Sequence, residues 1–348
     1  MEWGVSIPSD QTPRPDLPSL GWRDHFADQI APSEGDLAPM RVATVHRDRM
    51  SAEGTHGPLR LILPPKINTA EFAVGDWVLV DPGTRQLVRR LDRSTLLQRR
   101  TEGGRDMQLI AANVDTLFIV TSCNDDFNVA RLERYLALSN EAGTDPLIVL
   151  TKADRVETVE PFLDAVAPLQ RGLQVVAVTG TDASAAATLA PWCGAGQTVA
   201  LVGSSGVGKS SLLNTLTGKT GEDAQLTGGI RESDAKGRHT TTSRSLHRIP
   251  GGGCVIDTPG MRTLHVSDLS VGLDVLYAEI TDLAPHCRFR NCTHAHEPGC
   301  AVQAAVADGR LDAVRVARWR KLVEENDKNT PPPPGPRGKP VWTGNKRR

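Results

Sequence analysis

One stretch decides the fold: Gly203-Ser204-Ser205-Gly206-Val207-Gly208-Lys209-Ser210, which matches the phosphate-binding pattern G-x-x-x-x-G-K-[ST]. An apolar run at 198–202 precedes it and a helical run at 211–216 follows it, which is the strand-loop-helix context of such sites. Glycines let backbone N–H groups turn toward phosphates, and the start of a helix adds a favourable dipole. The pattern predicts nucleotide binding by Gly203, Ser204, Ser205, Gly206, Val207, Gly208, Lys209, Ser210 and Ser211.

Charged and hydroxyl groups at and after this loop predict phosphate chemistry. Lys209 would neutralise the β- and γ-phosphates in catalysis, and Ser210 would ligate Mg²⁺. Downstream, a short apolar strand at 254–256 ends in Asp257-Thr258-Pro259-Gly260. We expect the Asp257 carboxylate to hold Mg²⁺ through water and the N–H of Gly260 to contact the γ-phosphate.

A base-reading segment is predicted upstream of the phosphate loop. Thr151-Lys152-Ala153-Asp154 follows a buried strand and fits [NT]-K-x-D, with which GTPases bind guanine. The Asp154 carboxylate would accept hydrogen bonds from the base, and Thr151 and Lys152 complete this part of the nucleotide site. Thr151 replaces the commoner asparagine and loses part of its side-chain hydrogen bonding. Because ordinary GTPases place this segment after the phosphate loop, the order here predicts a circularly permuted chain.

Composition allows a protein of several domains. The chain has 348 residues, 39% of them apolar, and a formal charge of −1, so nucleic-acid binding requires local basic clusters. The sequence has no apolar run of the roughly 20 residues that span a bilayer. Its N-terminus lacks the basic start and apolar stretch of a secretory signal. We expect a cytoplasmic protein that does not bind membranes.

Changes of pattern divide the chain into five segments. Residues 1–36 lack periodicity and are predicted to be a disordered lead-in. Short apolar runs between turn residues predict a small β-barrel at 37–110. Alternating strands and helices predict a mostly parallel sheet covered by helices at 111–264. Helical stretches surround a Cys/His cluster at 265–327, and 328–348 are predicted to be a disordered, proline-rich basic tail.

Together these motifs resemble a family of circularly permuted GTPases that depend on the small ribosomal subunit, known as RsgA or YjeQ. The matching stretches follow the family's order and are 108–115, 151–154, 203–214, 237–242, 257–260 and 287–302. The resemblance implies a multi-domain α/β protein with an N-terminal OB-type β-barrel, a circularly permuted P-loop GTPase domain and a C-terminal helical zinc-binding domain. It also implies GTP hydrolysis with Mg²⁺, stimulated by the small ribosomal subunit during its late maturation. Expected partners are that subunit with its ribosomal RNA, GTP and GDP, and we expect a monomer.

Three cysteines and three histidines cluster near residues 286–300. In a reducing compartment, three thiolates and one imidazole favour a structural Zn²⁺ with a closed tetrahedral ligand set. The spacing alone leaves His286, His294 and His296 as candidates for the nitrogen ligand. The resemblance, with the pattern C-x4-C-x-H-x5-C, implies the ligands Cys287, Cys292, His294 and Cys300. We expect no catalysis from this metal, because no coordination position is left open.

The segment Gly237-Arg238-His239-Thr240-Thr241-Thr242 is predicted to be a switch loop, in which Thr240 or Thr241 binds Mg²⁺ when the γ-phosphate is present. Many GTPases place a water-orienting glutamine after the DxxG glycine, but this chain has Met261 there. A low intrinsic rate of hydrolysis follows. We hypothesise that His239 acts in catalysis once the ribosome orders the loop. The alternative is that His239 only caps or packs the loop.

Local basic clusters are the candidate contacts to ribosomal RNA. They are the C-terminal tail and, at the end of the barrel, Arg89, Arg90, Arg93, Arg99, Arg100 and Arg105. Two alternative functions stay open. One is a permuted GTPase of another ribosomal assembly step, and the other is a nucleotide-switched RNA-binding module with negligible hydrolysis, which Met261 favours.

Overall fold

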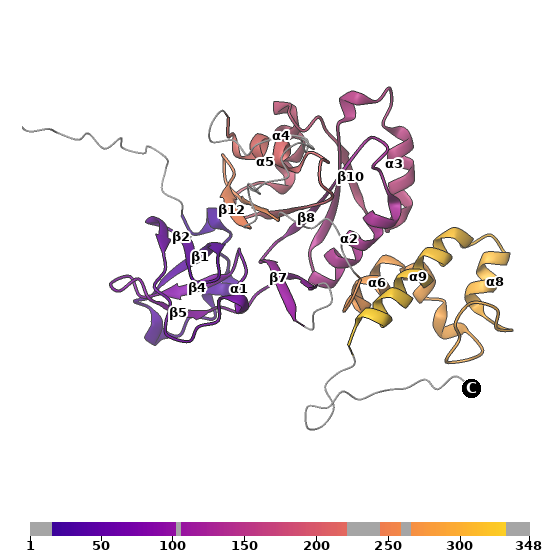
Figure 1. The fold of residues 1–348 in the computed structure, drawn as a ribbon, viewed down its shortest axis with the longest axis horizontal. Helices are drawn as coiled ribbons and strands as arrows, with labels where there is room; N and C mark the ends of the chain where they lie inside the picture. Colours follow the sequence, from indigo (N-terminus) through magenta and orange to yellow (C-terminus); the bar gives the residue numbers. More distant parts are fainter. Residues whose placement is uncertain (1–15, 102–105, 221–243, 259–265, 332–348) are drawn as a thin grey trace, which may run out of the picture.

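The computed structural model describes residues 16–101, 106–220, 244–258 and 266–331. Figure 1 shows three bodies in chain order: an N-terminal β unit, a central sheet covered by helices, and a C-terminal group of helices. Within these residues, eleven strands form one sheet, in which the β unit and the central sheet meet edge to edge.

The N-terminal unit is antiparallel, with the strand order β3-β2-β1-β4-β5. Its elements are β1 (Ala38–Val45), β2 (Met50–Gly54), β3 (Gly57–Arg60), the short 3-10 helix η3 (Thr69–Glu71), β4 (Trp77–Val80) and β5 (Leu87–Arg90). Two backbone hydrogen bonds connect Ile62 with Arg85 and Leu87. Among the described residues, however, β3 and β5 do not pair as strands. The small all-β unit is therefore confirmed, while closure into an OB-type barrel stays a prediction.

A separate antiparallel pair, which we call the arm, follows this unit. It consists of β6 (Leu96–Arg100) and β7 (Met107–Ala112). Its strand β7 lies next to η3 of the N-terminal unit, and β6 lies against the first long helix of the central domain. Arg100 in the arm also donates two hydrogen bonds of 2.8 Å to the Asp268 carboxylate of the C-terminal helices. The arm thus contacts all three bodies.

The central sheet has the strand order β10-β9-β8-β11-β13-β12, with all neighbours parallel except the pair β12–β13. Its strands are β8 (Thr116–Ser122), β9 (Asp145–Thr151), β10 (Gln174–Ala177), β11 (Thr198–Val202), β12 (Ser245–Arg248) and β13 (Cys254–Asp257). The helices between them are α2 (Val129–Ala142), η4 (Ala153–Arg155), α3 (Glu160–Val166), η5 (Ala167–Leu169), α4 (Ala183–Leu189), η6 (Ala190–Trp192) and α5 (Lys209–Thr217).

The strand order has a physical basis in the sequence. Every residue of β8 and β11 is buried, as expected for parallel strands that helices cover on both faces. Strands β8, β9 and β10 come first in the chain, yet β8 lies beside β11, which leads into the phosphate loop. The base-reading segment at the end of β9 and the phosphate loop therefore share one sheet edge, as the predicted permutation requires.

The prediction that residues 1–36 are disordered is wrong for the part of this segment that the structure describes. Residues 16–36 form η1 (Pro18–Leu20), α1 (Asp24–Ala27) and η2 (Pro32–Glu34). Leu20 is fully buried and Phe26 nearly so. The Phe26 ring lies 5.8 Å from the buried ring of Trp77 in β4. The aromatic residues of this segment are few and scattered, so the sequence showed no periodic pattern. They pack into a hydrophobic cluster whose other members come from distant segments.

Arg41 connects residues 16–36 to the N-terminal unit and to the central part of the sheet. Its side chain is 1% exposed and donates hydrogen bonds to the carbonyl groups of Leu20 and Asn113, the latter at 2.9 Å. It also donates to the Thr198 hydroxyl at the start of β11, at 2.7 Å. A buried guanidinium is tolerated only when its N–H groups are satisfied, so these contacts hold three segments in one arrangement.

The C-terminal body is helical, as predicted. It comprises α6 (Ser270–Leu276), α7 (Ala278–Thr281), η8 (Ala284–His286), α8 (Ala301–Ala307) and α9 (Ala313–Asn329). Helix α6 crosses α2 at Gly272, where an added Cβ would lie 2.0 Å from the Ala137 carbonyl oxygen. The close approach buries α6 against the central domain. Helix α9 runs to Asn329, so the predicted tail begins slightly too early at residue 328.

Candidate nucleotide and zinc sites

The phosphate loop has the strand-loop-helix geometry that its sequence predicts. It connects β11 to α5, and Gly203, Gly206 and Gly208 have φ values of 143°, 79° and 95°. A Cβ on Gly203 would lie 2.2 Å from the Val120 carbonyl oxygen of the neighbouring strand. Glycine is therefore required at 203 by a close backbone approach as well as by φ. The first turn of α5 follows directly, so its N–H groups point toward the loop.

Lys209 begins helix α5 and folds back over the loop. Its ammonium group donates hydrogen bonds to the carbonyl oxygens of Gly203, at 2.8 Å, and Ser204. The positive charge is thereby held at the mouth of the loop, where the pattern predicts that phosphates bind. Ser210 and Ser211 continue the same helical turn.

The base-reading segment contacts the phosphate loop through Thr151. Its hydroxyl oxygen lies 2.5 Å from the carbonyl oxygen of Val207 and 3.1 Å from that of Thr121. Lys152 follows with φ of 57°, and Asp154 is exposed in η4. The fold thus brings residues 151–154 beside residues 203–210. This contact also gives threonine at 151 a structural role, since its hydroxyl connects the two loops.

Asp257 ends β13 beside the phosphate loop. It pairs in register with Leu201 of β11 and is only 6% exposed. The next residue, Thr258, is fully buried and donates its hydroxyl to the Leu201 carbonyl oxygen at 2.5 Å. A carboxylate held this rigidly at the edge where α5 begins is suited to a hard cation such as Mg²⁺.

Four predicted site residues lie outside the described residues. They are His239, Thr240, Thr241 and Gly260, and Met261 lies outside as well. Their predicted roles in magnesium binding, phosphate binding and catalysis stay predictions.

Arg131 is a neighbour of the phosphate loop that sequence reasoning missed. It lies in the first turn of α2, which Asn128 caps by accepting a 2.9 Å hydrogen bond from the Arg131 N–H. Its guanidinium donates to the Ser204 hydroxyl at 2.5 Å. The two residues are 73 positions apart, and no local motif signals such a contact.

The cysteine and histidine cluster has the geometry of a tetrahedral metal site. The ligand atoms of Cys287, Cys292, His294 and Cys300 all lie within 4.8 Å of one another. The Cys287 and Cys300 sulfurs are 3.8 Å apart, and His294 Nδ1 is 3.4 and 3.5 Å from them. Zn–S bonds of about 2.3 Å and Zn–N bonds of about 2.0 Å at tetrahedral angles require very similar separations. The residues present therefore fit Zn²⁺.

Surrounding groups fix these ligands. Backbone N–H groups of Ala301 and Gln303 donate to the sulfurs of Cys287 and Cys300 at 3.3 and 3.4 Å, which stabilises thiolates. The Gln303 side chain donates to the His294 carbonyl oxygen at 2.6 Å. The His294 ring also lies 5.4 Å from the ring of Trp319 in α9. The cluster therefore joins an irregular loop to α8 and α9.

Of the three histidine candidates, the structure brings only His294 into this four-residue cluster. The side chains of His286 and His296 are exposed. His294 has φ of 56°, a left-handed conformation that turns its ring inward toward the sulfurs. This agrees with the ligand set that the resemblance implied.

Several arginines proposed for RNA binding are paired within the protein. Arg89 binds Glu34 at 2.7 Å, Arg93 binds the buried Asp76 at 2.6 Å, and Arg100 binds Asp268 at 2.7 Å. Carboxylates therefore already compensate the charge of these three arginines, while the predicted basic cluster as a whole stays a prediction. Arg105 lies outside the described residues.

In the described part of the chain, no helix is long and apolar enough to cross a bilayer.

Comparisons with a family model and with known sequences both match the RsgA GTPase family. A sequence model of the family described as RsgA GTPase matches residues 90–267. The chain is also 61% identical over 335 residues to the small ribosomal subunit biogenesis GTPase RsgA of Mesorhizobium japonicum. That alignment covers 96% of this chain and 97% of the relative, so it includes all three bodies.

Solved structures show the same fold. YjeQ from Thermotoga maritima matches with a TM-score of 0.60 and 22% identity, over 83% of this chain and 98% of that structure. YloQ, described as a circularly permuted GTPase, matches with a TM-score of 0.60 and 24% identity, over 86% and 98%. At this identity the likeness concerns the fold, and it agrees with the permuted strand order.

Proposed function

The chain belongs to the RsgA GTPase family, and we propose that it hydrolyses GTP in the biogenesis of the small ribosomal subunit. The observation that carries this function is the contact of Thr151 with Val207, at 2.5 Å. It joins a guanine-reading segment to a phosphate loop across a permuted sheet. A nucleotide bound by both loops has its base at residues 151–154 and its phosphates at residues 203–211.

Each predicted nucleotide contact has a role in this function. The backbone of Gly203, Ser204, Ser205, Gly206, Val207 and Gly208 wraps the phosphates, and Ser210 and Ser211 continue the site into helix α5. Lys209 neutralises charge on the β- and γ-phosphates. Thr151 and Lys152 position the segment, and the exposed Asp154 carboxylate accepts hydrogen bonds from guanine. The buried contact of Thr151 supports this arrangement, since it fixes the distance between the two halves of the site.

Magnesium is the cofactor that GTP hydrolysis in this family implies. We propose that Ser210 and Asp257 hold the ion, with Thr240 or Thr241 joining them when GTP is bound and Gly260 donating to the γ-phosphate. The buried, register-paired Asp257 at the end of β13 supports this assignment. When bound, Mg²⁺ neutralises charge that develops on the phosphate oxygens.

A single structural Zn²⁺ is proposed for the C-terminal body, with Cys287, Cys292, His294 and Cys300 as ligands. Four protein ligands leave no open position, so this metal supplies stability and no chemistry. Its function is to hold the loop 287–300 against α8 and α9, together with the contacts of His294 with Gln303 and Trp319.

Catalysis is proposed to depend on the partner. Met261 cannot orient the attacking water as a glutamine does, and we assign this role to His239 once the ribosome contacts it. Replacing His239 with Ala should reduce subunit-stimulated turnover while GDP affinity stays unchanged. An unchanged stimulated rate would instead assign His239 to capping or packing of its loop.

The proposed partners are the small ribosomal subunit with its RNA, together with GTP and GDP, and the protein is proposed to act as a cytoplasmic monomer. The N-terminal unit would be an OB-type barrel, a fold that binds oligonucleotides. The backbone hydrogen bonds from Ile62 to Arg85 and from Leu87 to Ile62 support this, since they draw the end strands together.

Phosphate release, measured with and without purified ribosomal subunits, tests the function. We expect slow hydrolysis by the protein alone and a large stimulation by small subunits only. Lys209→Ala should abolish both rates and serves as the inactive control. Stimulation by large subunits would favour another assembly step. Nucleotide-dependent RNA binding without measurable hydrolysis would favour a nucleotide-switched module.

A further inference from the structure

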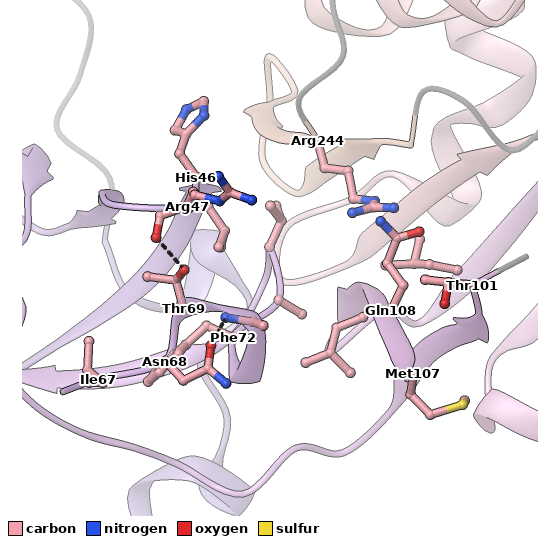
Figure 2. Close-up of a pocket in the computed structure, with 16 residues that line it drawn as sticks. His46, Arg47, Ile67, Asn68, Thr69, Phe72, Thr101, Met107, Gln108 and Arg244 are labelled. Atoms are coloured by element: carbon pink, nitrogen blue, oxygen red, sulfur yellow. Dashed lines mark hydrogen bonds between the residues drawn. The ribbon is translucent and has the colours of Figure 1, made fainter. Parts of the chain in front are cut away.

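A pocket of about 640 Å³ lies where the N-terminal unit, the arm and β12 meet. Figure 2 shows its walls: His46 and Arg47 after β1, the segment with Asn68 and Phe72, the arm residues Met107 and Gln108, and Arg244 above them. The volume falls within the range of about 300–1,000 Å³ that is typical of ligand sites. None of the residues placed in the phosphate or zinc sites lines it.

The polar side of this pocket favours an anion. His46, Arg47 and Arg244 contribute to its wall, and no described lining residue carries a carboxylate. The Nε atom of Arg244 is buried and has no hydrogen-bond partner among the described residues. Burial, and to a smaller extent the nearby Arg99, lower the pKa of Arg244. An anion that accepted a hydrogen bond from this guanidinium would offset its desolvation.

The opposite side of the pocket favours a flat, partly apolar group. Phe72, Val74 and Ile110 contribute apolar surface to the pocket, and the side-chain amide of Gln108 lies between this surface and Arg244, beside the guanidinium (Figure 2). The Gln108 carbonyl oxygen accepts from Arg99 at 3.3 Å, which leaves its NH₂ group directed elsewhere. Aromatic or apolar surface beside amide groups is the usual environment of an unstacked nucleobase in RNA-binding proteins.

We propose that this pocket binds one unstacked nucleotide of single-stranded RNA, with its phosphate at Arg244 and its base against Phe72 and Gln108. A free nucleoside monophosphate offers the same groups, so the chemistry is shared by both sources. RNA is favoured because it carries a further phosphate next to the bound nucleotide, and the exposed Arg47 in the pocket wall offers a second positive charge for it. The inference rests on the proposed function only in naming ribosomal RNA as the natural source.

The location of the pocket connects it to the nucleotide site. Arg244 directly precedes Ser245, which pairs with Thr44 of β1 and, on its other side, with Asp257 of β13. Strand β1 ends at Val45, which also lines the pocket. An RNA nucleotide bound here would therefore contact Arg244, which directly precedes the strand that borders the proposed Mg²⁺ ligand Asp257. The structure offers a short path by which RNA binding affects the GTPase site.

Photo-crosslinking tests the site directly. The probe is a short oligouridylate with one 4-thiouridine, mixed with the full chain in GDP and Mg²⁺, because the guanine site does not accept uracil. We expect mass spectrometry to find the crosslink in peptides that contain residues 67–74 or 107–110. Crosslinks confined to other surfaces would overturn the proposal.

Affinity measurements with matched variants give the second test. Loss of one charge-assisted hydrogen bond in Arg244→Gln should weaken oligouridylate binding about tenfold or more. Arg60→Gln, at an exposed arginine of β3 outside the pocket, should bind within about twofold of wild type. Gln108→Ala should weaken binding less than Arg244→Gln. Equal affinities of all variants, with unchanged melting temperatures, would contradict the assignment.

Competition separates the possible ligands. Uridine monophosphate that displaces the probe at similar phosphate concentration would identify a mononucleotide site, whereas much weaker displacement supports RNA. Polyglutamate that competes as well as oligouridylate would overturn a base-specific pocket. Subunit-stimulated hydrolysis, measured on the same variants, keeps the two claims apart. Crosslinking at the pocket without subunit-stimulated hydrolysis would contradict only the proposed function. Subunit-stimulated hydrolysis without crosslinking at the pocket would contradict only the proposed RNA site.

Discussion

The guanidinium of Arg315 in α9 donates a 2.9 Å hydrogen bond to the carboxylate of Glu133 in α2, and both side chains are buried. Arg318 donates to the same carboxylate oxygen at 2.9 Å. Helix α2 also carries Arg131, which contacts Ser204 of the phosphate loop. One helix therefore contacts the phosphate loop at its first turn and the C-terminal body through Glu133.

Glu133→Gln should destabilise the attachment of the C-terminal helices. The substitution keeps the shape but removes the buried carboxylate that Arg315 and Arg318 share, which leaves Arg315 only the half-exposed carboxylate of Glu279. Breaking a buried pair costs about 3–5 kcal/mol. Urea unfolding measures the loss. As a matched control, Asp308→Asn removes a pair with Arg310 whose side chains are 63% and 58% exposed. Its effect should be at most about 1 kcal/mol, and similar losses in both variants would contradict this view of Glu133.

Thr151→Val should weaken GDP and GTP binding. It removes the hydroxyl that connects the base-reading segment to the Val207 carbonyl group, while keeping the side-chain volume. Loss of one such hydrogen bond costs about 1 kcal/mol, or roughly fivefold in affinity. Isothermal titration calorimetry measures the change. Thr151→Ser retains the hydroxyl and should bind nearly as well as wild type, so equal losses in both variants would exclude the hydroxyl as the cause.

Metal analysis should find one zinc ion per chain. His294→Gln removes a ligand of the closed set and should lower the zinc content to near zero. His286→Gln and His296→Gln change exposed histidines and should leave it at one. Removal of zinc by a chelator should also lower the melting temperature, because binding free energy of a structural zinc is folding free energy. Retention of zinc in His294→Gln would overturn the ligand set.

Stability should fall in mild acid because of His247 in β12. Burial, and then the Lys219 ammonium 3.2 Å away, lower the pKa of His247 from its usual 6.5. Below pH 6.5 the unfolded chain therefore binds a proton that the folded chain does not. The free energy of unfolding should decrease from about pH 6.5 downward until the folded pKa is reached, and stay level above about pH 6.5. Urea titrations at several pH values should show a smaller decrease for His247→Gln, with no difference between the slopes near pH 8.

Buried strands were the elements most readily predicted from sequence. The run 198–202 coincides with β11, and the run 146–150 lies within β9, because continuous apolar residues are needed where helices cover both faces of a sheet. Strand β12 was missed. It contains Leu246 as its one buried apolar residue between polar neighbours, and it is a strand because β13 and β1 pair with its two edges. Such pairing is long-range and leaves no local periodicity.

The residues of the candidate sites also fall into two groups: those that a local sequence pattern predicted and those whose position depends on the folded chain. Linear motifs predicted the phosphate loop, the base-reading segment and the Cys/His cluster, since each carries its chemistry within a short stretch of the chain. The choice of His294 among three histidines came from the family resemblance. Arg131 and Arg244 were not predicted, because their positions beside Ser204 and Gln108 depend on the folded chain. The arginines at the end of the barrel were predicted as a group, but their carboxylate partners come from distant segments. Sequence patterns identify the residues that could bind a ligand or take part in a reaction. They do not reveal which of these residues are already held in ion pairs within the folded protein.

The pairing of Thr44 with Ser245 has a consequence for dissection of the protein. Strand β12 would be the outer edge of the central sheet if β1 did not cover it. A fragment that began after β5 would expose the N–H and C=O groups of that edge, and exposed edges recruit strands from other molecules. The N-terminal unit therefore shields the GTPase sheet from self-association. A GTPase fragment prepared without it should aggregate unless its edge is covered or charged.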